Sequence, residues 1–269
     1  MKGTIEIMKK TLGIVLILSM LACGDKLFLH KIKDVQAMTN IRSNQWYEEM
    51  TDGRNDQIYT YKMQGSGYFY YQVIPDTGGY YYDDKYEKST NYYISTTMTK
   101  NDKVYVDDQY SYYSKGGYKS VRYAFKVGDK IKIKVCDSNG YKTHYKIKIT
   151  FKKMKNFENE GNDSKSKANV IKKGVTYTGL AMEDDIDWFV FKAPKTKKYK
   201  IKSVCINEGM ASYSHAVESY KGYKQNKFLH VISGRGWETV FSGKLKKGQK
   251  VYVKISDGGD DEMYKLRVK

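Results

Sequence analysis

The chain has 269 residues and a formal net charge of +18, and it holds 27 Tyr, 23 Gly and only two Pro. Aromatic and β-branched side chains suit the pleated, half-buried surface of a strand, and many short runs of this chain alternate them with Lys. The composition therefore disfavours a helical fold and predicts an all-β protein.

Residues 1–37 have the layout of an export segment. In "MKKTLGIVLILSMLACG" (8–24), two lysines precede an apolar run of about a dozen residues, too short for a typical membrane span. Two processing sites stay open. Cleavage after Ala37 in "VQA" fits the small-residue rule of signal peptidase, whereas "MLAC" resembles a loose lipoprotein box with lipid attachment at Cys23. Either site predicts an extracellular protein, secreted or attached to the cell surface.

The chain that remains after export is still strongly basic. Removing residues 1–37 takes away six lysines and three acids, which leaves a net charge of +15. Lysines on the outer faces of strands are mostly solvated, but a charge of this size also attracts anionic cell-wall polymers over long distances. Nucleic acid is a poor fit, because the chain carries an export signal and shows no nucleic-acid-binding motif. Cys136 and Cys205 remain, and they either pair in a disulfide or lie as two buried thiols.

The first half of the exported chain is rich in tyrosine. The stretches "GYFYYQV" (67–73), "GGYYYDDKY" (78–86), "NYYIS" (91–95) and "QYSYYSKGGY" (109–118) place many rings within about fifty residues. Alternation along a strand buries about half of such rings in the core, and three consecutive tyrosines cannot all point inward. The pattern therefore predicts exposed rings of the kind that contact peptides or glycans.

An internal repeat divides the exported chain into two copies. "FKVGDKIKIKVCDSNG" (125–140) aligns without gaps on "LKKGQKVYVKISDGGD" (245–260), at an offset of 120 residues. "HYKIKI" (144–149) and "MYKLRV" (263–268) follow in the same order, and "IYTYKM" (58–63) resembles "WFVFKA" (188–193). A repeat of this length is typical of tandem domains, because solenoid units are much shorter. We expect two tandem antiparallel β-sandwich domains of jelly-roll character, at residues 38–153 and 154–269.

Acids are bunched at the start of the second copy, in "FENEGND" (157–163) and "MEDDIDW" (182–188). Ca²⁺ takes six to eight oxygen ligands from carboxylates and carbonyls on flexible segments. The Asp-x-Asp-x-Asp-Gly frame of an EF-hand loop is absent. Two interpretations stay open, a calcium site or a solvated polar linker followed by a turn.

The second copy carries a family resemblance in the order of its motifs. From residue 157 to the end they run "ENEGND", "ANVIKKGVTYTGL", "EDDIDWFVF", "GKLKKGQKVYVKI" and "YKLRV". This order resembles the bacterial pre-peptidase C-terminal domain, and it is similar to the collagen-binding domains of clostridial collagenases. The resemblance implies a calcium site, with Asp184 or Asp185 as the partner of Asp187. Its remaining ligands would be Glu158, Glu160, Asn162 and Asp163. The resemblance assigns no collagen-contacting position to any tyrosine of this chain.

Signals of catalysis are weak. The exported chain has three histidines, His144, His215 and His230, in unrelated contexts, with no His-Glu-x-x-His, Gly-x-Ser-x-Gly or phosphate-binding loop. We therefore expect a non-catalytic binding module for an extracellular protein or polysaccharide. The alternative is a structural spacer of the cell envelope, held by charge or by a lipid on Cys23. Exposed rings that cluster on one face favour the binding module.

Overall fold

The structure is a computed structural model, and it describes most of residues 38–269. The segments outside the description are 1–37, 52–55, 76–78, 83–84, 89–92, 113–115, 138–140, 183, 207–213, 257 and 259–261. The predicted export segment, with both processing sites, therefore lies outside the described residues. Among those residues, no helix has the length and apolar character needed to cross a membrane.

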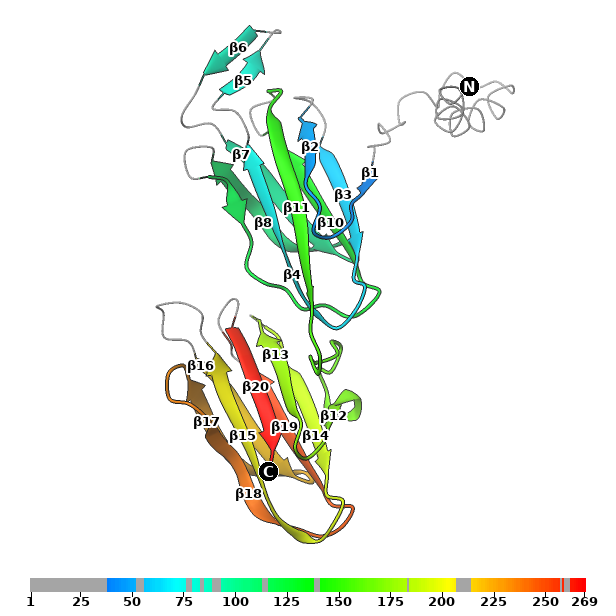
Figure 1. The fold of residues 1–269 in the computed structure, drawn as a ribbon, viewed down its shortest axis with the longest axis vertical. Helices are drawn as coiled ribbons and strands as arrows, with labels where there is room; N and C mark the ends of the chain where they lie inside the picture. The colour runs from blue at the N-terminus through cyan, green and yellow to red at the C-terminus, as the bar shows by residue number, and fades with distance from the viewer. Residues whose placement is uncertain are drawn as a thin grey trace, which may run out of the picture. The chain divides into compact units, whose positions relative to one another are not determined.

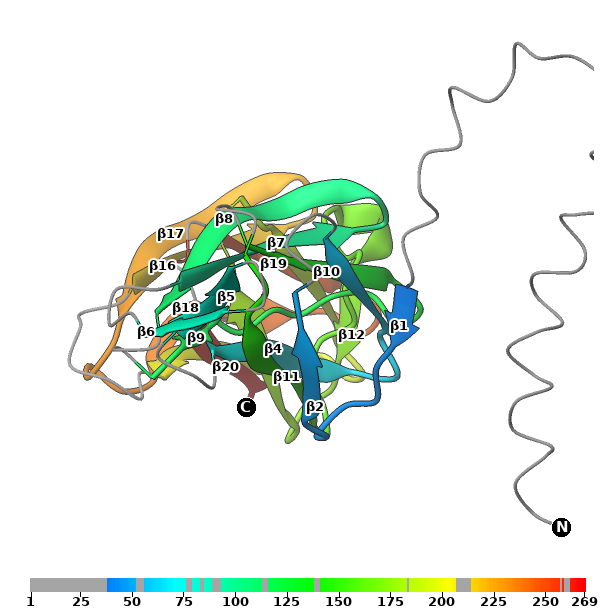
Figure 2. The same cartoon turned by 90° about the horizontal axis from the view of Figure 1, so that it is seen from above.

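The first half of the described chain folds as two facing antiparallel sheets (Figure 1). The five-stranded sheet has the order β1 (Met38–Asn40), β3 (Gln57–Lys62), β10 (Lys130–Cys136), β7 (Tyr93–Lys100) and β8 (Lys103–Tyr112). The four-stranded sheet has the order β2 (Tyr47–Met50), β11 (His144–Lys153), β4 (Gly67–Pro75) and β9 (Tyr118–Lys119). A hairpin of β5 (Gly79–Tyr82) and β6 (Lys85–Lys88) is added to this sandwich. Seen from above, β7, β8 and β10 lie in one layer, and β4 and β11 lie in the other (Figure 2).

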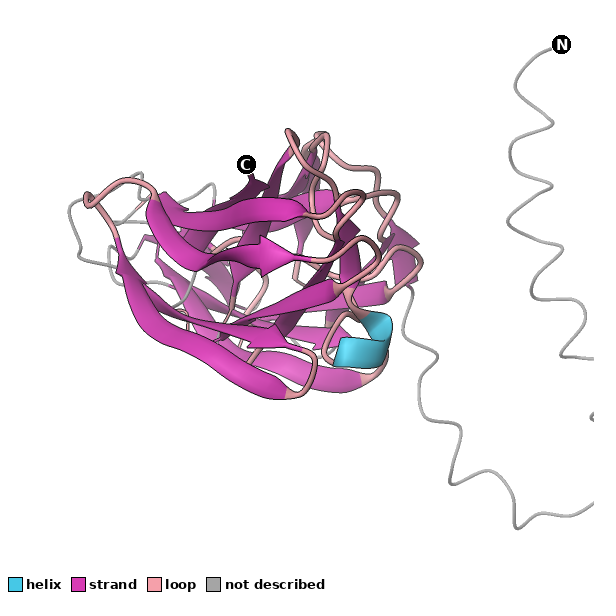
Figure 3. Ribbon diagram, turned by 90° about the horizontal axis from the view of Figure 1, so that it is seen from below, coloured by secondary structure: helices cyan, strands magenta, loops and turns pink. Residues whose placement is uncertain are grey.

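The second half repeats this plan strand for strand. Its five-stranded sheet has the order β12 (Asn169–Ile171), β14 (Asp187–Lys192), β19 (Lys250–Ser256), β16 (Ser214–Lys221) and β17 (Lys224–Ile232). Its four-stranded sheet has the order β13 (Thr176–Ala181), β20 (Glu262–Val268), β15 (Lys197–Ile206) and β18 (Glu238–Leu245). A short 3₁₀ turn, η2 (Lys165–Lys167), is the helical segment drawn among the strands in Figure 3.

The matching strand orders confirm the predicted fold class of two tandem antiparallel β-sandwiches. In each copy the first strand pairs in parallel, β1 with β3 and β12 with β14, and the rest of the sheet is antiparallel. The aligned runs of the sequence repeat form β10 and β19, which lie at the same place in their sheets. The domain boundary near residue 153 remains a prediction, although β11 ends there and β12 begins at Asn169.

Lysine alternation sets the two faces of these strands. Along β10 the residues Ile131, Ile133 and Val135 are buried in the core, and the intervening lysines point outward. Burying each such side chain contributes roughly 1.5–3 kcal/mol. In β4 the same period buries Tyr71 and leaves Tyr70 half-buried, as the alternation in "GYFYYQV" predicts.

Cys136 and Cys205 lie on strands of different sandwiches. Cys136 ends β10 and is half-buried, whereas Cys205 is buried in β15. No disulfide joins them in the structure, so the disulfide alternative is not observed. Cys136 lies 2.8 Å from the hydroxyl of Ser95, and Cys205 lies in the side-chain cluster analysed below.

Candidate metal centre and aromatic face

Residues 157–163, which precede η2, follow the edge of the second sandwich. The amide of Glu158 donates to the carbonyl of Thr178 at 2.9 Å, and the amide of Trp188 donates to the carbonyl of Asn162 at 3.0 Å. These bonds fasten the segment to β13 and to the start of β14. They place the side chains of Glu158 and Asn162 beside Asp187, the first residue of β14.

Five of the residues predicted from the sequence come together there. Carboxylate oxygens of Glu158, Glu160 and Asp187 all lie within 4.8 Å of one another. Asn162 donates its side-chain amide to Asp187 Oδ1 at 3.1 Å, and the carboxylate of Asp185 acts on Asp187 through its charge. Glu158, Asn162 and Asp187 are each at most 2% exposed. We call Glu158, Glu160, Asn162, Asp185 and Asp187 the acidic centre.

Tyr264 of β20 connects two carboxylates of the acidic centre. Its hydroxyl lies 2.5 Å from Glu158 Oε2 and 2.8 Å from Asp187 Oδ2. A phenol has a single proton to donate, so it satisfies only one of these oxygens at a time. The amide of Leu180 donates to the other oxygen of Glu158 at 2.6 Å. The remaining negative charge therefore needs protons or a cation.

The pKa of every carboxyl group in the acidic centre is raised. Burial raises the pKa of Glu158 and of Glu160 well above its ordinary value, and the neighbouring carboxylate of Asp187 raises each pKa further. Burial also raises the pKa of Asp185 to about 6. Burial and the charge of Asp185 raise the pKa of Asp187 to about 7. The centre therefore holds its charges poorly without a positive partner.

Three oxygens of the centre are buried and accept no hydrogen bond. They are Glu160 Oε1, Asn162 Oδ1 and Asp185 Oδ2. Buried polar atoms are normally paired, so these three oxygens are free to contact a bound group. Carboxylate and amide oxygens from a loop are the donor set that suits Ca²⁺. The residues of the acidic centre fit a hard divalent cation.

The two other predicted ligands lie at the periphery. Asp163 is exposed, yet its charge helps to raise the pKa of Glu160 and of Asp185. Asp184 is also exposed and has a left-handed backbone with φ 58°. Of the two candidate partners of Asp187, Asp185 is therefore the one that lies within the acidic centre.

A second feature lies on the outer face of the five-stranded sheet. Trp188 of β14, Tyr252 of β19 and Tyr220 of β16 project there from neighbouring strands, and the register places Tyr252 directly beside Tyr220. The rings of Trp188 and Tyr220 are 5.4 Å apart between centroids. Tyr223, in the turn after β16, is 95% exposed. We call Trp188, Tyr220, Tyr223 and Tyr252 the aromatic face.

A lysine lies over all four rings. The ammonium of Lys165 is 4.0 Å from the ring centroid of Tyr220, and its distances to the other three centroids are 5.1, 5.8 and 6.0 Å. Cations bind at such distances to the negative face of an aromatic ring. A cavity of about 510 Å³ opens beside Lys165, Tyr223 and Tyr252. In the structure these rings surround the ammonium of a lysine from the same chain.

The aromatic face was not assigned from the sequence. Trp188, Tyr220 and Tyr252 are each the outward-pointing member of an alternating strand, a pattern that the sequence does contain. The predicted concentration of rings was instead in the first sandwich, where Tyr93, Tyr110 and Tyr112 form a smaller group on β7 and β8. Strand pairing is what collects single rings from three strands on one surface.

Comparisons with known proteins give little beyond the fold. No family model matches the chain, and no curated protein matches it in sequence. The tandem CBM22-1–CBM22-2 domains of Xyn10C from Paenibacillus barcinonensis superpose with a TM-score of 0.28 and 10% identity, over 85% of this chain and 87% of that one. The M60 catalytic domain of Clostridium perfringens ZmpB with its CBM51 domains gives a TM-score of 0.27 and 7% identity. That match covers 79% of this chain and 33% of ZmpB, so this chain spans about a third of that structure. Likeness at this level carries no argument about function.

Proposed function

We propose that this protein is a non-catalytic, extracellular binding protein that holds a polysaccharide or an extended protein on its aromatic face, with calcium at the acidic centre. The observation that carries the proposal is the collection of Trp188, Tyr220, Tyr223 and Tyr252 around the ammonium of Lys165. Tyr223 is exposed and the other three rings are half-buried, and their clustering on one face is the feature that favours a binding module over a spacer.

The surroundings of the aromatic face suit a polar polymer. In the cross-strand row that holds Trp188, Lys254 pairs with Glu218 at 3.0 Å, and Gln225 donates to the same carboxylate at 3.0 Å. Tyrosine and tryptophan give apolar contact area with a polar edge, which suits sugar rings and extended peptides. A flat sheet face lined this way can contact several units of a chain at once. The ligand class proposed is therefore a polymer.

Calcium would stabilise the second sandwich through the acidic centre. Its ligands would be Glu158, Glu160 and Asp187, with Asn162 and Asp185 contributing the oxygens that have no partner. When bound, the ion would neutralise carboxylates that otherwise repel one another. The residues themselves fasten the preceding segment to β13 and β14, so the metal would fix the start of this sandwich. This role is structural and lies apart from ligand contact.

A spacer held at the envelope by charge is the second candidate, and the lysine-rich outer faces favour it. Lys197, Lys198 and Lys200 of β15 are all exposed, and the exported chain carries +15 in total. Attraction of this kind to anionic cell-wall polymers weakens as salt is added. It would not depend on the aromatic face.

Depletion assays on insoluble polymers test the proposal. Purified protein is mixed with cellulose, xylan, chitin, peptidoglycan or gelatin, at low and at moderate salt, and soluble products are measured alongside. We expect retention on at least one polymer at moderate salt without any product. The variant Trp188→Ala/Tyr223→Ala should bind at least about tenfold more weakly, because an aromatic contact typically contributes 1–3 kcal/mol. The matched control is Tyr86→Ala/Tyr110→Ala, which removes exposed rings of the first sandwich.

Two results would contradict this function. Retention that disappears at moderate salt and is equal in both variants would support the charge-held spacer. Release of soluble products from a retained polymer would show catalysis and overturn the non-catalytic role.

A further inference from the structure

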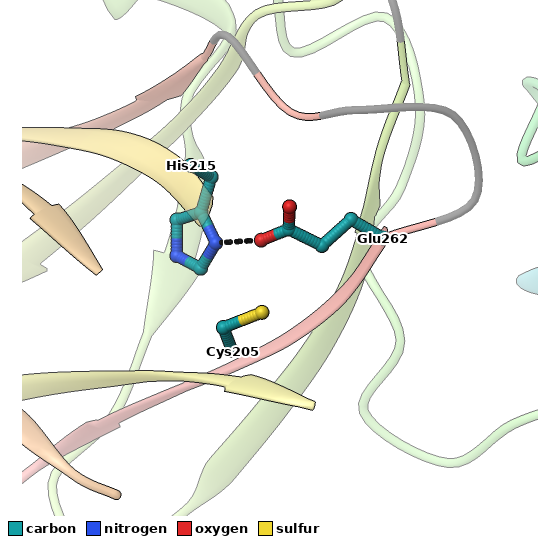
Figure 4. Close-up of side chains that lie close together, drawn as sticks. All are labelled: Cys205, His215 and Glu262. Carbon is teal, nitrogen blue, oxygen red and sulfur yellow. Dashed lines mark hydrogen bonds and ion pairs between the residues drawn. The ribbon is translucent and has the colours of Figure 1, made fainter. Parts of the chain in front are cut away.

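A second cluster of metal-binding side chains lies inside the second sandwich. Cys205 lies near the end of β15, His215 near the start of β16, and Glu262 begins β20 (Figure 4). One ligand atom from each residue lies within 4.8 Å of the other two. Cys205 is 4% exposed, Glu262 is 1% exposed and His215 is fully buried. In Figure 4 the thiol points toward the carboxylate, which in turn meets His215 Nδ1.

The hydrogen bonds of Ser203 are compatible with a proton on Nε2 of His215. Ser203 donates its own hydroxyl proton to the carbonyl of Lys265 at 3.3 Å. Its oxygen, 3.3 Å from His215 Nε2, is then left to accept from Nε2–H. Nδ1 therefore faces the Glu262 carboxylate as the ligand atom of the ring. Metal-bound histidines are held in this way, with the distal N–H donated to a neighbouring oxygen.

One oxygen of the Glu262 carboxylate is left without a partner. The second oxygen of Glu262, Oε2, is buried and accepts no hydrogen bond. The thiol of Cys205 also makes a hydrogen bond with the Glu262 carboxylate. A buried donor set with an orphaned oxygen costs stability unless a ligand satisfies it.

The first sandwich shows that the fold does not need these residues. Aligned by the repeat and by strand register, the positions of Cys205, His215 and Glu262 correspond to Pro75, Ile94 and Thr143. None of these three side chains is a typical metal ligand, and the first sandwich forms the same sheets around them. The cluster is therefore a feature added to one copy.

We propose that Cys205 Sγ, His215 Nδ1 and a carboxylate oxygen of Glu262 bind a zinc-class divalent ion. Zn²⁺ is bound in proteins by thiolate, imidazole and carboxylate, and three such ligands leave a fourth position. One thiolate, one carboxylate and a neutral imidazole balance the two positive charges of the ion, so the buried site is neutral. Binding releases two protons, one from the thiol and one shared between His215 and Glu262.

This site differs in chemistry from the acidic centre. The acidic centre offers only oxygen, which suits hard cations, whereas sulfur and nitrogen select softer transition metals. A test that contradicts one of the two metal sites therefore leaves the other unaffected.

Cobalt titration of the metal-free full chain tests the zinc site. Co²⁺ bound to a thiolate gives a charge-transfer band in the near ultraviolet, which a site made only of oxygen cannot give. We expect the band to saturate at one equivalent and to be removed by Zn²⁺. Cys205→Ala should abolish it. Cys136→Ala and Cys23→Ala are the matched controls and should leave it unchanged, as should Glu160→Gln/Asp187→Asn in the acidic centre.

A second variant covers the case in which Cys205→Ala does not fold. Glu262→Gln keeps the shape of the side chain, and we expect it to weaken Zn²⁺ binding at least tenfold, since ligand replacement removes a charge from the site. Proton release, measured in weak buffer, should be two per ion in the wild type. A folded wild type that gives no band, or a band that persists in folded Cys205→Ala, would overturn the proposal.

Discussion

Tyr145 and Tyr264 occupy the same place in the two sandwiches, yet their hydroxyls have different partners. The Tyr145 hydroxyl is 2.5 Å from the hydroxyl of Tyr59, and both rings are buried in the first core. The Tyr264 hydroxyl lies instead between two carboxylates of the acidic centre, at 2.5 and 2.8 Å, and donates its proton to one of them at a time. In the first copy this tyrosine makes a hydrogen bond with a neutral hydroxyl, and in the second copy the equivalent tyrosine makes one with carboxylate oxygens.

Replacing these two tyrosines with phenylalanine separates their roles. We expect Tyr264→Phe to lower the stability of the second sandwich by about 1.5–3 kcal/mol, because hydrogen bonds to charged groups are the stronger kind. Tyr145→Phe should cost about 1 kcal/mol, the usual value for a neutral pair. Urea unfolding of both variants in calcium measures the difference. Equal losses would contradict a special role of Tyr264.

Calcium should stabilise the folded chain measurably. At a hundredfold excess over its dissociation constant, a ligand that binds only the folded state contributes about 2.7 kcal/mol. We therefore expect the melting temperature to rise in calcium relative to chelator, and the rise to disappear in Glu160→Gln. Calorimetric titration should give one ion per chain. If calcium does not change the melting temperature of the wild type, the calcium site is contradicted and the polar-linker interpretation is supported.

The raised pKa of Asp187 predicts that, in chelator, the difference in stability between the wild type and Asp187→Asn depends on pH. The pKa is about 7 in the folded chain and 3.8 ordinarily, so the folded state holds the proton more tightly. Its stabilising contribution is complete below pH 4 and is lost as the pH rises to 7. Asp187→Asn resembles the protonated carboxyl. The variant should be as stable as the wild type near pH 4 and more stable near pH 7.5. Each tenfold difference in proton affinity between the folded and unfolded states is equivalent to about 1.4 kcal/mol.

When calcium is added at pH 7.5, the wild type should become more stable than Asp187→Asn, because the variant lacks one of the negative charges that bind the ion. Melting curves of the two proteins at both pH values, in chelator and in calcium, give the comparison. A wild type that is the more stable protein at pH 7.5 in chelator would contradict the raised pKa.

Gly179 of β13 marks the closest packing beside the acidic centre. A Cβ at this position would lie 2.2 Å from the Tyr264 ring and 2.6 Å from Glu158 Oε2. We expect Gly179→Ala to cost several kcal/mol, in the range of overpacked cores, and to remove calcium binding. Gly65→Ala is the matched control, since its Cβ would meet the Phe151 ring at an ordinary 3.8 Å. Thermal melts of the two variants test the expectation, and similar melting would contradict it.

Tyr223 should matter for binding and not for stability. Because the ring is 95% exposed, Tyr223→Ser should change the free energy of unfolding by less than about 0.5 kcal/mol. Its affinity for the retained polymer should nonetheless fall severalfold. Tyr86→Ser, on β6 of the first sandwich, is the control for loss of an exposed ring. Loss of stability without loss of binding would contradict the assigned role.

The sequence by itself determined the fold class, the duplication and the acidic stretches. Alternation at period two is a local property, so "KIKIKV" specifies an amphipathic strand without any knowledge of its neighbours. The repeat at an offset of 120 residues likewise predicted two copies of one sandwich. Bunched acids pointed to the segment that carries Glu158 and Glu160.

Only the tertiary structure decided which side chains meet. Asp184 and Asp185 were left as alternatives by the sequence, and the structure exposes the first and half-buries the second, whose charge acts on Asp187. Tyr264 reaches Glu158 across 106 residues, and His215 reaches Glu262 across 47. Such contacts depend on strand order and register across two sheets, which are long-range properties, so no local pattern in the sequence could reveal them.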